Sequence, residues 1–185
     1  MTMMRQRFKR AVAAISLIAA AQMAMSQDQS LDPLFDALRE AEGDAARQIE
    51  TKIWEEWADS GSASMNFLLN RGRAALESGE TVQAIEHFTA LIDHAPDFTE
   101  AYNARATAYF QAGRYGPSLA DIREVMARNP RHFGALGGLA MILEEIGESA
   151  GALEAYRRVE ELYPNREGLA EAITRLRREV EGDTI

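Results

Sequence analysis

Hydrophobic and polar positions follow helical spacing in a unit that repeats along the chain. Each unit carries a small residue followed, four positions later, by a large apolar or aromatic one. The three pairs are Ala84 with Phe88, Ser118 with Ile122 and Ala152 with Tyr156. Positions four apart lie on one face of an α-helix, so the pattern predicts helices that each bury one face.

Glycines and prolines mark the limits of this unit. Gly79, Gly113 and Gly147 are 34 residues apart, and Pro96, Pro130 and Pro164 keep the same interval. Glycine can adopt the left-handed conformation that ends a helix, and proline stops a helix from continuing. A period shared by independent columns is the sign of stacked repeats, here with two antiparallel helices in each.

The columns resemble those of the tetratricopeptide repeat (TPR) family, which has a large residue, a large-small pair, an aromatic, an alanine, an aromatic and a proline. The third copy fits best, with Leu136, Leu139, Ala140, Leu143, Ala152, Tyr156 and Pro164. The second copy has Tyr102, Arg105, Ala106, Tyr109, Ser118, Ile122 and Pro130. The first has Leu68, Arg71, Gly72, Ala75, Ala84, Phe88 and Pro96.

The resemblance implies an all-α fold, a TPR-type α-solenoid of antiparallel helix pairs. The paired helices should approach closely where both present small residues: Gly72 with Ala84, Ala106 with Ser118, and Ala140 with Ala152. Within the second helices, Thr81 and Ser149 are candidate N-terminal caps, and Pro117 suits a first helical turn. The stretch from Asn129 to Glu145, with its glycines, also resembles small exported bacterial TPR proteins to which no activity is assigned.

We predict four segments: 1–26, a signal peptide; 27–62, a degenerate N-terminal helix pair; 63–166, three TPR repeats (65–98, 99–132 and 133–166); and 167–185, a C-terminal capping helix and tail. In the N-terminal pair, Asp32-Pro33 begins a helix and Gly43-Asp44 separates the two. Trp54 and Trp57 continue the apolar stripe of the second helix. We expect them to be buried against the first repeat rather than to form a stacking platform.

Four basic residues, Arg5, Arg7, Lys9 and Arg10, precede an uncharged stretch from Ala11 to Met25. The small residues Ala24 and Ser26 suit a signal peptidase, so we predict cleavage near Ser26 and export to a bacterial periplasm. The rival is an uncleaved membrane anchor. The 15 uncharged residues fall short of the roughly 20 that a spanning helix needs.

Charge and cysteine content exclude several classes of function. The net charge is −9, and the four basic residues of the leading segment leave −13 on the remainder. Such a surface repels phosphate groups, which argues against nucleic acid and against peripheral membrane binding. The chain has no cysteine. Disulfides, thiol catalysis and attachment of a lipid to cysteine are therefore excluded.

The first helices of successive repeats should line a concave groove that receives a peptide or a helix. Helical spacing places in it Asn66, Asn70, Arg73, Asn103, Thr107, Gln111, Gly134, Gly137, Gly138 and Met141. Their amide, hydroxyl and guanidinium groups can bind a peptide, or can simply be solvated. The positions that clamp a C-terminal carboxylate in the family hold Leu69, Arg73, Ala104, Gly134 and Gly138. Only Arg73 is charged, so we predict no chaperone-tail binding.

Three glycines on one helix make its groove face nearly bare backbone, although each costs about 1 kcal/mol relative to alanine. Gly134, Gly137 and Gly138 therefore indicate tight packing of another helix or of a ligand, and the N-terminal helices are possible occupants. Arg71 and Arg105 stand in a column that is usually apolar. A half-buried arginine needs a counter-charge, so we expect Arg105 to pair with Asp121.

Signals for catalysis are weak. His87 and His94 lie about 10 Å apart along one helix, too far to share a metal ion. His132 has no acidic or histidine neighbour at ligand spacing, and the chain has no phosphate-binding glycine loop or nucleophile elbow. We predict no enzyme, no cofactor and no metal, but a scaffold that binds a protein partner. The alternatives are a membrane-tethered protein that self-associates through its repeats and, less favoured, a hydrolytic or metal enzyme.

Overall fold

The computed structural model describes residues 30–182, so the predicted signal segment 1–26 lies outside the described residues. The chain divides into two compact units, residues 1–33 and 34–185, and the repeats lie in the second. Within residues 30–182 the regular structure is entirely α-helical. The predicted fold class is therefore confirmed.

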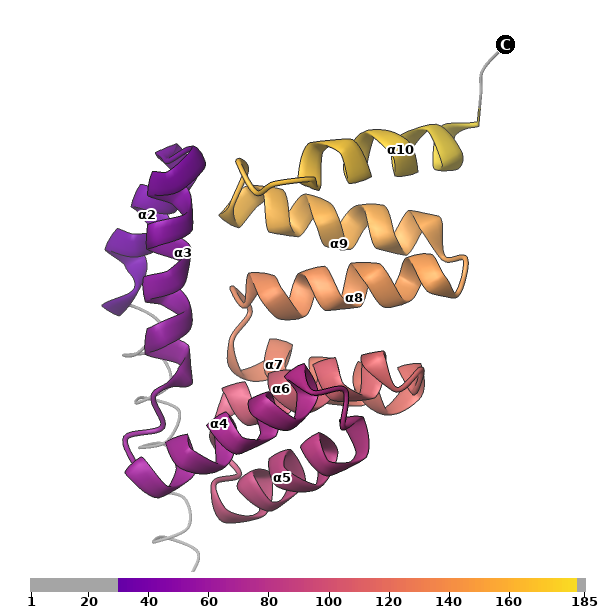
Figure 1. The fold of residues 1–185 in the computed structure, drawn as a ribbon. Helices are drawn as coiled ribbons and strands as arrows, with labels where there is room; N and C mark the ends of the chain where they lie inside the picture. Colours follow the sequence, from indigo (N-terminus) through magenta and orange to yellow (C-terminus); the bar gives the residue numbers. More distant parts are fainter. Residues whose placement is uncertain (1–29, 183–185) are drawn as a thin grey trace, which may run out of the picture. The chain divides into compact units, whose positions relative to one another are not determined.

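The helices form pairs in chain order (Figure 1). They are α2 (Asp32–Glu40), α3 (Gly43–Ala58), α4 (Ala63–Glu77), α5 (Thr81–His94), α6 (Thr99–Gln111), α7 (Tyr115–Arg128), α8 (Phe133–Glu145), α9 (Ser149–Leu162) and α10 (Leu169–Glu181). Helices α4 to α9 make three antiparallel pairs, and α10 packs on α9. We call α4 to α10 the array.

The turns within the pairs use glycine as predicted. Gly79, Gly113 and Gly147 have φ of 78°, 69° and 80°, which is the left-handed region. The two predicted caps are wrong. Thr81 and Ser149 are the first helical residues, and the positions before them are glutamates that make no side-chain cap hydrogen bond. The second helices therefore depend on the preceding glycine turns rather than on a hydroxyl cap.

Small residues bring the helices of each pair together. Gly72 faces the ring of the buried Phe88 so closely that a Cβ on it would overlap the ring. In the second pair the Ser118 hydroxyl donates to the Ala106 carbonyl over 2.7 Å. Because the two helices lie so close at these positions, large neighbouring side chains such as Phe88 fill the remaining space, and the interface is as tightly packed as a protein interior.

The predicted ion pair inside the second repeat is present. The Arg105 guanidinium donates from Nε and Nη2 to the two Asp121 carboxylate oxygens, over 2.7 and 2.8 Å. Its Nη1 also donates to the Thr89 hydroxyl. The hydrogen bond to Asp121 raises the pKa of Arg105. Arg71, by contrast, is exposed, so the expectation that it is half-buried is wrong.

Helix α10 closes the C-terminal end of the array. Its apolar stripe, Leu169, Ile173 and Leu176, is buried, and the helix packs on α9. Arg175 of the same helix donates to Glu144 of α8 over 2.5 Å. An amphipathic terminal helix of this kind covers the core that stacking alone would leave open.

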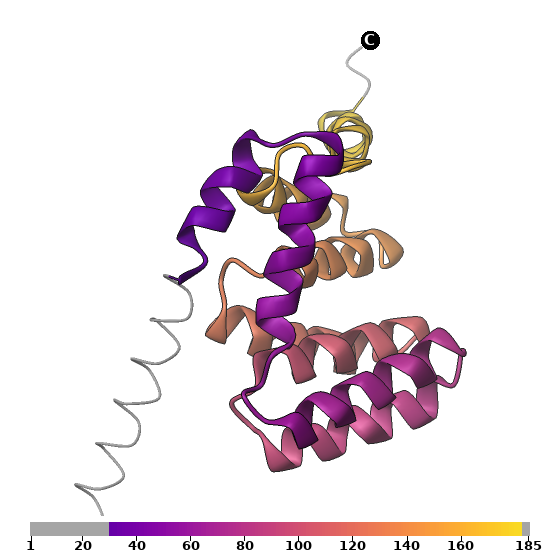
Figure 2. The same cartoon turned by 60° about the vertical axis from the view of Figure 1, so that its left-hand side comes forward.

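Helices α2 and α3 do not continue the stack. Figures 1 and 2 show α3 running crosswise to the array, beside the ends at which α6 and α8 begin. Phe35 and Leu38 of α2 and Ile53 of α3 are almost completely buried. This placement decides which part of the predicted groove is open.

Candidate functional site

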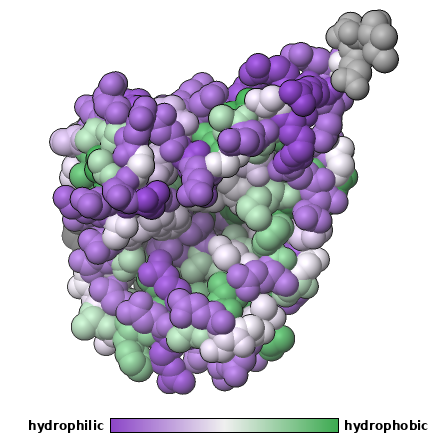
Figure 3. Space-filling view, turned by 45° about the horizontal axis from the view of Figure 1, so that its top comes forward, coloured by the Kyte–Doolittle hydropathy of each residue, from purple (hydrophilic) through white to green (hydrophobic). Residues whose placement is uncertain are grey.

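The candidate site is the surface lined by α4, α6 and α8, the first helices of the three pairs. Figure 3 shows one face of the molecule, with a hollow around which hydrophilic and hydrophobic residues meet. Residues one repeat apart occupy equivalent places on neighbouring helices, for example Arg73, Thr107 and Met141. The surface thus consists of rows that run across the three helices.

Two indoles of α3 cover the first turn of α8. Trp57 stacks on His132 with ring centroids 4.1 Å apart, and Trp54 meets Phe133 edge to face at 5.5 Å. Phe35 of α2 also contacts both Trp57 and Phe133. The expectation that the tryptophans pack on the first repeat is wrong, because α3 crosses the array and reaches the start of the third.

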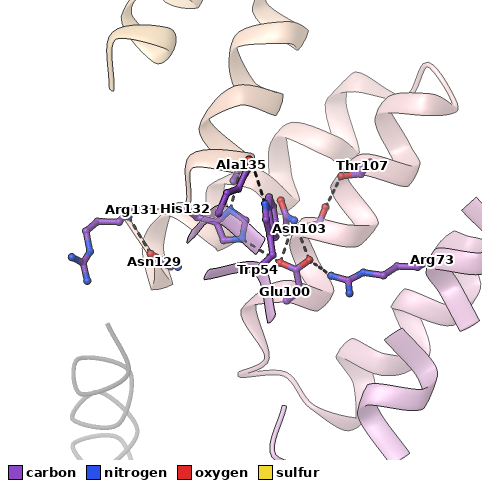
Figure 4. Close-up of polar contacts among 10 residues, drawn as sticks. Trp54, Arg73, Glu100, Asn103, Thr107, Asn129, Arg131, His132 and Ala135 are labelled. Carbon is purple, nitrogen blue, oxygen red and sulfur yellow. Dashed lines mark hydrogen bonds and ion pairs between the residues drawn. The ribbon is translucent and has the colours of Figure 1, made fainter. Parts of the chain in front are cut away.

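His132 is held at both ring nitrogens. Its Nδ1 accepts from the Ala135 amide over 3.1 Å and thereby caps α8, while Nε2 lies 3.2 Å from Glu100 Oε2 (Figure 4). His132 and Glu100 are only 1% and 3% exposed. No acidic residue lies at ligand spacing from His132 along the chain, because Glu100 comes from the previous repeat. Only the stacking of repeats brings the two together.

Arg73 and Asn103, both predicted to line the groove, hold the buried Glu100. Arg73 Nη2 donates to Glu100 Oε1 over 2.7 Å, and the Asn103 amide donates to both carboxylate oxygens at 3.2 and 3.3 Å. Figure 4 shows Arg73, Asn103 and His132 converging on the Glu100 carboxylate. A buried carboxylate needs such partners, because its desolvation is otherwise very unfavourable.

The bare glycine face of α8 is covered by side chains of the same molecule. A Cβ on Gly134 would overlap the Trp54 indole, and one on Gly137 would come within 2.8 Å of Arg166 Nη1. At Gly138 the closest atom would be Ile122 Cδ1, at an ordinary 3.7 Å. At Gly134 the occupant is an N-terminal helix, one of the possibilities that the sequence left open.

Further contacts tie α2 and α3 to the array. The Tyr163 hydroxyl donates to Glu50 over 3.4 Å, and the Asn165 amide donates to the Ala41 carbonyl over 2.9 Å. Burial, then the nearby Glu50 charge and hydrogen bond, raise the pKa of Tyr163. Asn66, also predicted for the groove, contacts the linker before α4: its amide donates to Asp59 over 2.9 Å.

Four of the predicted groove residues remain on the open part of the surface. Asn70, Thr107 and Gln111 are exposed, and Met141 is 46% exposed. The Thr107 hydroxyl donates to the Asn103 carbonyl of its own helix. We call Thr107, Gln111 and Met141 the open row. No contact here shows that any of these residues binds a partner, so that role stays a prediction.

Within residues 30–182 no three histidine or acidic side chains lie close enough together to hold a metal ion. Every buried side-chain nitrogen or oxygen of that part has a hydrogen-bond partner, including those of the His132 and Glu100 pair. In the same range no helix has the length and apolar character required to span a bilayer. The buried polar groups beneath α3 therefore form a hydrogen-bonded network within the protein.

Comparison with known proteins agrees with the repeat pattern. A tetratricopeptide repeat model matches residues 69–116 and 118–167. A TPR repeat-containing protein of Rhizobium etli is 38% identical over 159 residues, which is 85% of this chain and 78% of that protein. The chain belongs to the tetratricopeptide repeat family. The predicted family is thus confirmed.

Solved TPR structures share the fold. The first TPR of Spaghetti (RPAP3), bound to the HSP90 peptide SRMEEVD, superposes with a TM-score of 0.61 at 21% identity, over 64% of this chain and 94% of that one. The Sgt2 TPR domain of Aspergillus fumigatus gives 0.60 at 23% identity, over 65% and 81%. The MamA protein gives 0.59 at 19% identity, over 88% and 83%.

Proposed function

We propose that this TPR protein is a non-catalytic interaction module that binds a polypeptide segment along the open row of its concave face. The supporting observation is the open row itself: Thr107 and Gln111 of α6 and Met141 of α8 are exposed, and Met141 is a large apolar side chain among polar ones. Amide and hydroxyl groups can hydrogen-bond a peptide backbone, while the flexible Met141 side chain adapts to apolar side chains.

The Spaghetti domain, which shares the fold, was solved with an HSP90 peptide bound. The binding of a peptide on a TPR surface supports the general mode but not the same ligand. Here Arg73 already pairs with Glu100, and the other clamp positions hold uncharged residues. The proposed partner is therefore a peptide that does not depend on a clamped terminal carboxylate.

The test is co-purification with tagged full-length protein, comparing Thr107→Arg and Met141→Arg with the wild type. We expect both variants to lose the same bound polypeptide, because the added charge and bulk lie in the open row. Val82→Arg is the control, since Val82 is 70% exposed on α5. Arg73 and Asn103 are poor choices because their loss would leave the buried Glu100 with His132 alone. Capture unaffected by either open-row variant would contradict the proposal.

We further propose that the protein is exported with cleavage near Ser26 and acts in a bacterial periplasm. The support is the basic and then uncharged leading segment. Mass spectrometry of the mature protein should find an N-terminus near Gln27. An intact leading segment in the membrane fraction would favour the tethered alternative instead.

A further inference from the structure

We propose that α3 is an exchangeable internal ligand, and that the site beneath it accepts a partner helix of the same chemistry. That chemistry is a carboxylate, an aromatic side chain four residues later and a second aromatic three residues after that, as in Glu50, Trp54 and Trp57. The proposal rests on the proposed function and names the class of partner for a second part of the same face.

The surface under α3 has the features of a built site. Gly134 leaves room for one indole, since any side chain there would overlap Trp54. His132 presents its ring face to Trp57 and is oriented by a hydrogen bond at each nitrogen. Phe133 supplies an apolar wall. An aromatic pair on a helix is thus recognised by shape and ring geometry, beyond the apolar area that it buries.

The floor of the site is more polar than the core of the array. Glu100, His132, Asn103 and Arg73 form it, whereas the contacts within the pairs are made mainly by alanines and large apolar residues. When α3 leaves, water can solvate those polar groups and so offset part of the lost contact. Interfaces of this mixed kind resemble those between separable domains and partners.

The attachment of α3 allows it to leave without unfolding a repeat. Its backbone stays farther from the array than the repeat helices stay from one another, so long side chains make most of the contacts. The linker Asp59–Ser62 separates α3 from α4, and Gly61 in it has φ of 72°. A rotation in this linker breaks no helix of the array.

The experiment uses a fluorescently labelled synthetic peptide of residues 34–59 and full-length protein. The double variant Trp54→Ala with Trp57→Ala weakens the docking of α3 on its site. This variant should therefore bind the peptide. Wild type should bind it at least about tenfold more weakly, because its own α3 competes at a high effective concentration. Adding Gly134→Leu to the double variant should abolish binding by filling the indole site.

Gly138→Ala, added to the same double variant, is the matched control. It also replaces a glycine of α8, but an added Cβ there meets only Ile122 at ordinary distance, so peptide binding should persist. Failure of the folded double variant to bind the peptide overturns the proposal, as does equal binding after Gly134→Leu. Circular dichroism establishes that each variant is folded.

If the double variant does not fold, hydrogen exchange of the wild-type protein decides. Amides of α2 and α3 should exchange at least about tenfold faster than those of α6 and α7, as local opening of a separable unit requires. Equal protection overturns the proposal. The open-row variants test the proposed function separately. If they capture the same polypeptide as wild type while the labelled peptide still exchanges with α3, the proposed function is contradicted and the α3 site is not.

Discussion

Two buried carboxylates of this protein are satisfied in different ways. Asp121 meets one arginine, Arg105, within a single helix pair. Glu100 meets Arg73, Asn103 and His132, which come from α4, from α6 and from the turn before α8. Trp57 then stacks on that histidine. The first arrangement strengthens one repeat, whereas the second joins three repeats to a helix outside the stack.

The difference shows that the array and its junction with α3 are held by different kinds of contact. Contacts inside the pairs depend on small residues that recur with the period of the sequence, and in the second pair also on a local ion pair. The junction with α3 has no period, since Trp54 and Trp57 are the two tryptophans of the chain and both lie there. We therefore expect substitutions in the pairs to change global stability and substitutions at the junction to change docking.

The largest expected effect is that of Asp121→Ala. It leaves the Arg105 guanidinium, whose side chain is only 17% exposed, without a counter-charge, so the free energy of unfolding should fall by about 3 kcal/mol. Urea denaturation measures it. Glu124→Ala, which breaks the more exposed pair with Arg128, is the control and should cost less than about 1 kcal/mol. Equal effects would contradict the distinction between the two pairs.

Gly72→Ala should lower the free energy of unfolding by about 2 kcal/mol, because the new Cβ overlaps the fully buried Phe88 ring and forces the pair apart. The whole array should melt earlier, with the loss visible in far-UV circular dichroism. A variant as stable as wild type would show that α4 and α5 can separate freely.

Gly134→Ala sharpens the comparison, because the same substitution now lies at the junction. It should displace Trp54 and shift tryptophan emission to longer wavelength, while the array melts within about 1 kcal/mol of wild type. Gly138→Ala, with room for its Cβ, should leave the emission unchanged and add up to about 1 kcal/mol through helix propensity. Unchanged emission in Gly134→Ala would mean that the indole tolerates a Cβ.

The smallest effect concerns two tyrosines. Burial, followed by a hydrogen bond with Glu144, raises the pKa of Tyr156 to about 12, and burial near Glu50 raises that of Tyr163. A raised pKa favours the folded protein below about pH 10, where unfolded tyrosine begins to ionise, and that contribution is lost as pH rises through the folded pKa. Phenolate absorbance measures both groups.

The two tyrosines report on different regions, so the titration also tests the comparison. Tyr163 contacts Glu50 of α3, so Gly134→Ala should bring the pKa of Tyr163 closer to its ordinary value. The pKa of Tyr156, which is raised by burial and Glu144, should stay raised. Tyr156→Phe and Tyr163→Phe assign the two components. A parallel shift of both groups would show that the junction and the array open together.

Much of the array could be predicted from sequence, because its contacts are local and repeated. The spacing of 34 residues placed the glycine turns, and the columns brought Gly72 to its partner helix and Arg105 to Asp121. Each of these contacts joins segments within one repeat or in equivalent columns. The helical period therefore fixed them before any tertiary contact was known.

The candidate site could be predicted only in outline. Helical spacing put Arg73 and Asn103 on the groove face, but spacing cannot say that a buried Glu100 claims both of them. A possible signal was His132, a titratable residue between a helix-ending proline and a glycine-rich helix. Its partner lies 32 residues away, and no local pattern names it.

The sequence by itself determined that this protein is a stack of helix pairs, because apolar period, glycine turns and prolines act over short distances along the chain. The tertiary structure alone decided that α3 crosses the stack and fills the Gly134 face. That choice depends on the direction of a short linker and on ring contacts between residues more than seventy positions apart, such as Trp57 and His132. Neither leaves a periodic trace in the sequence.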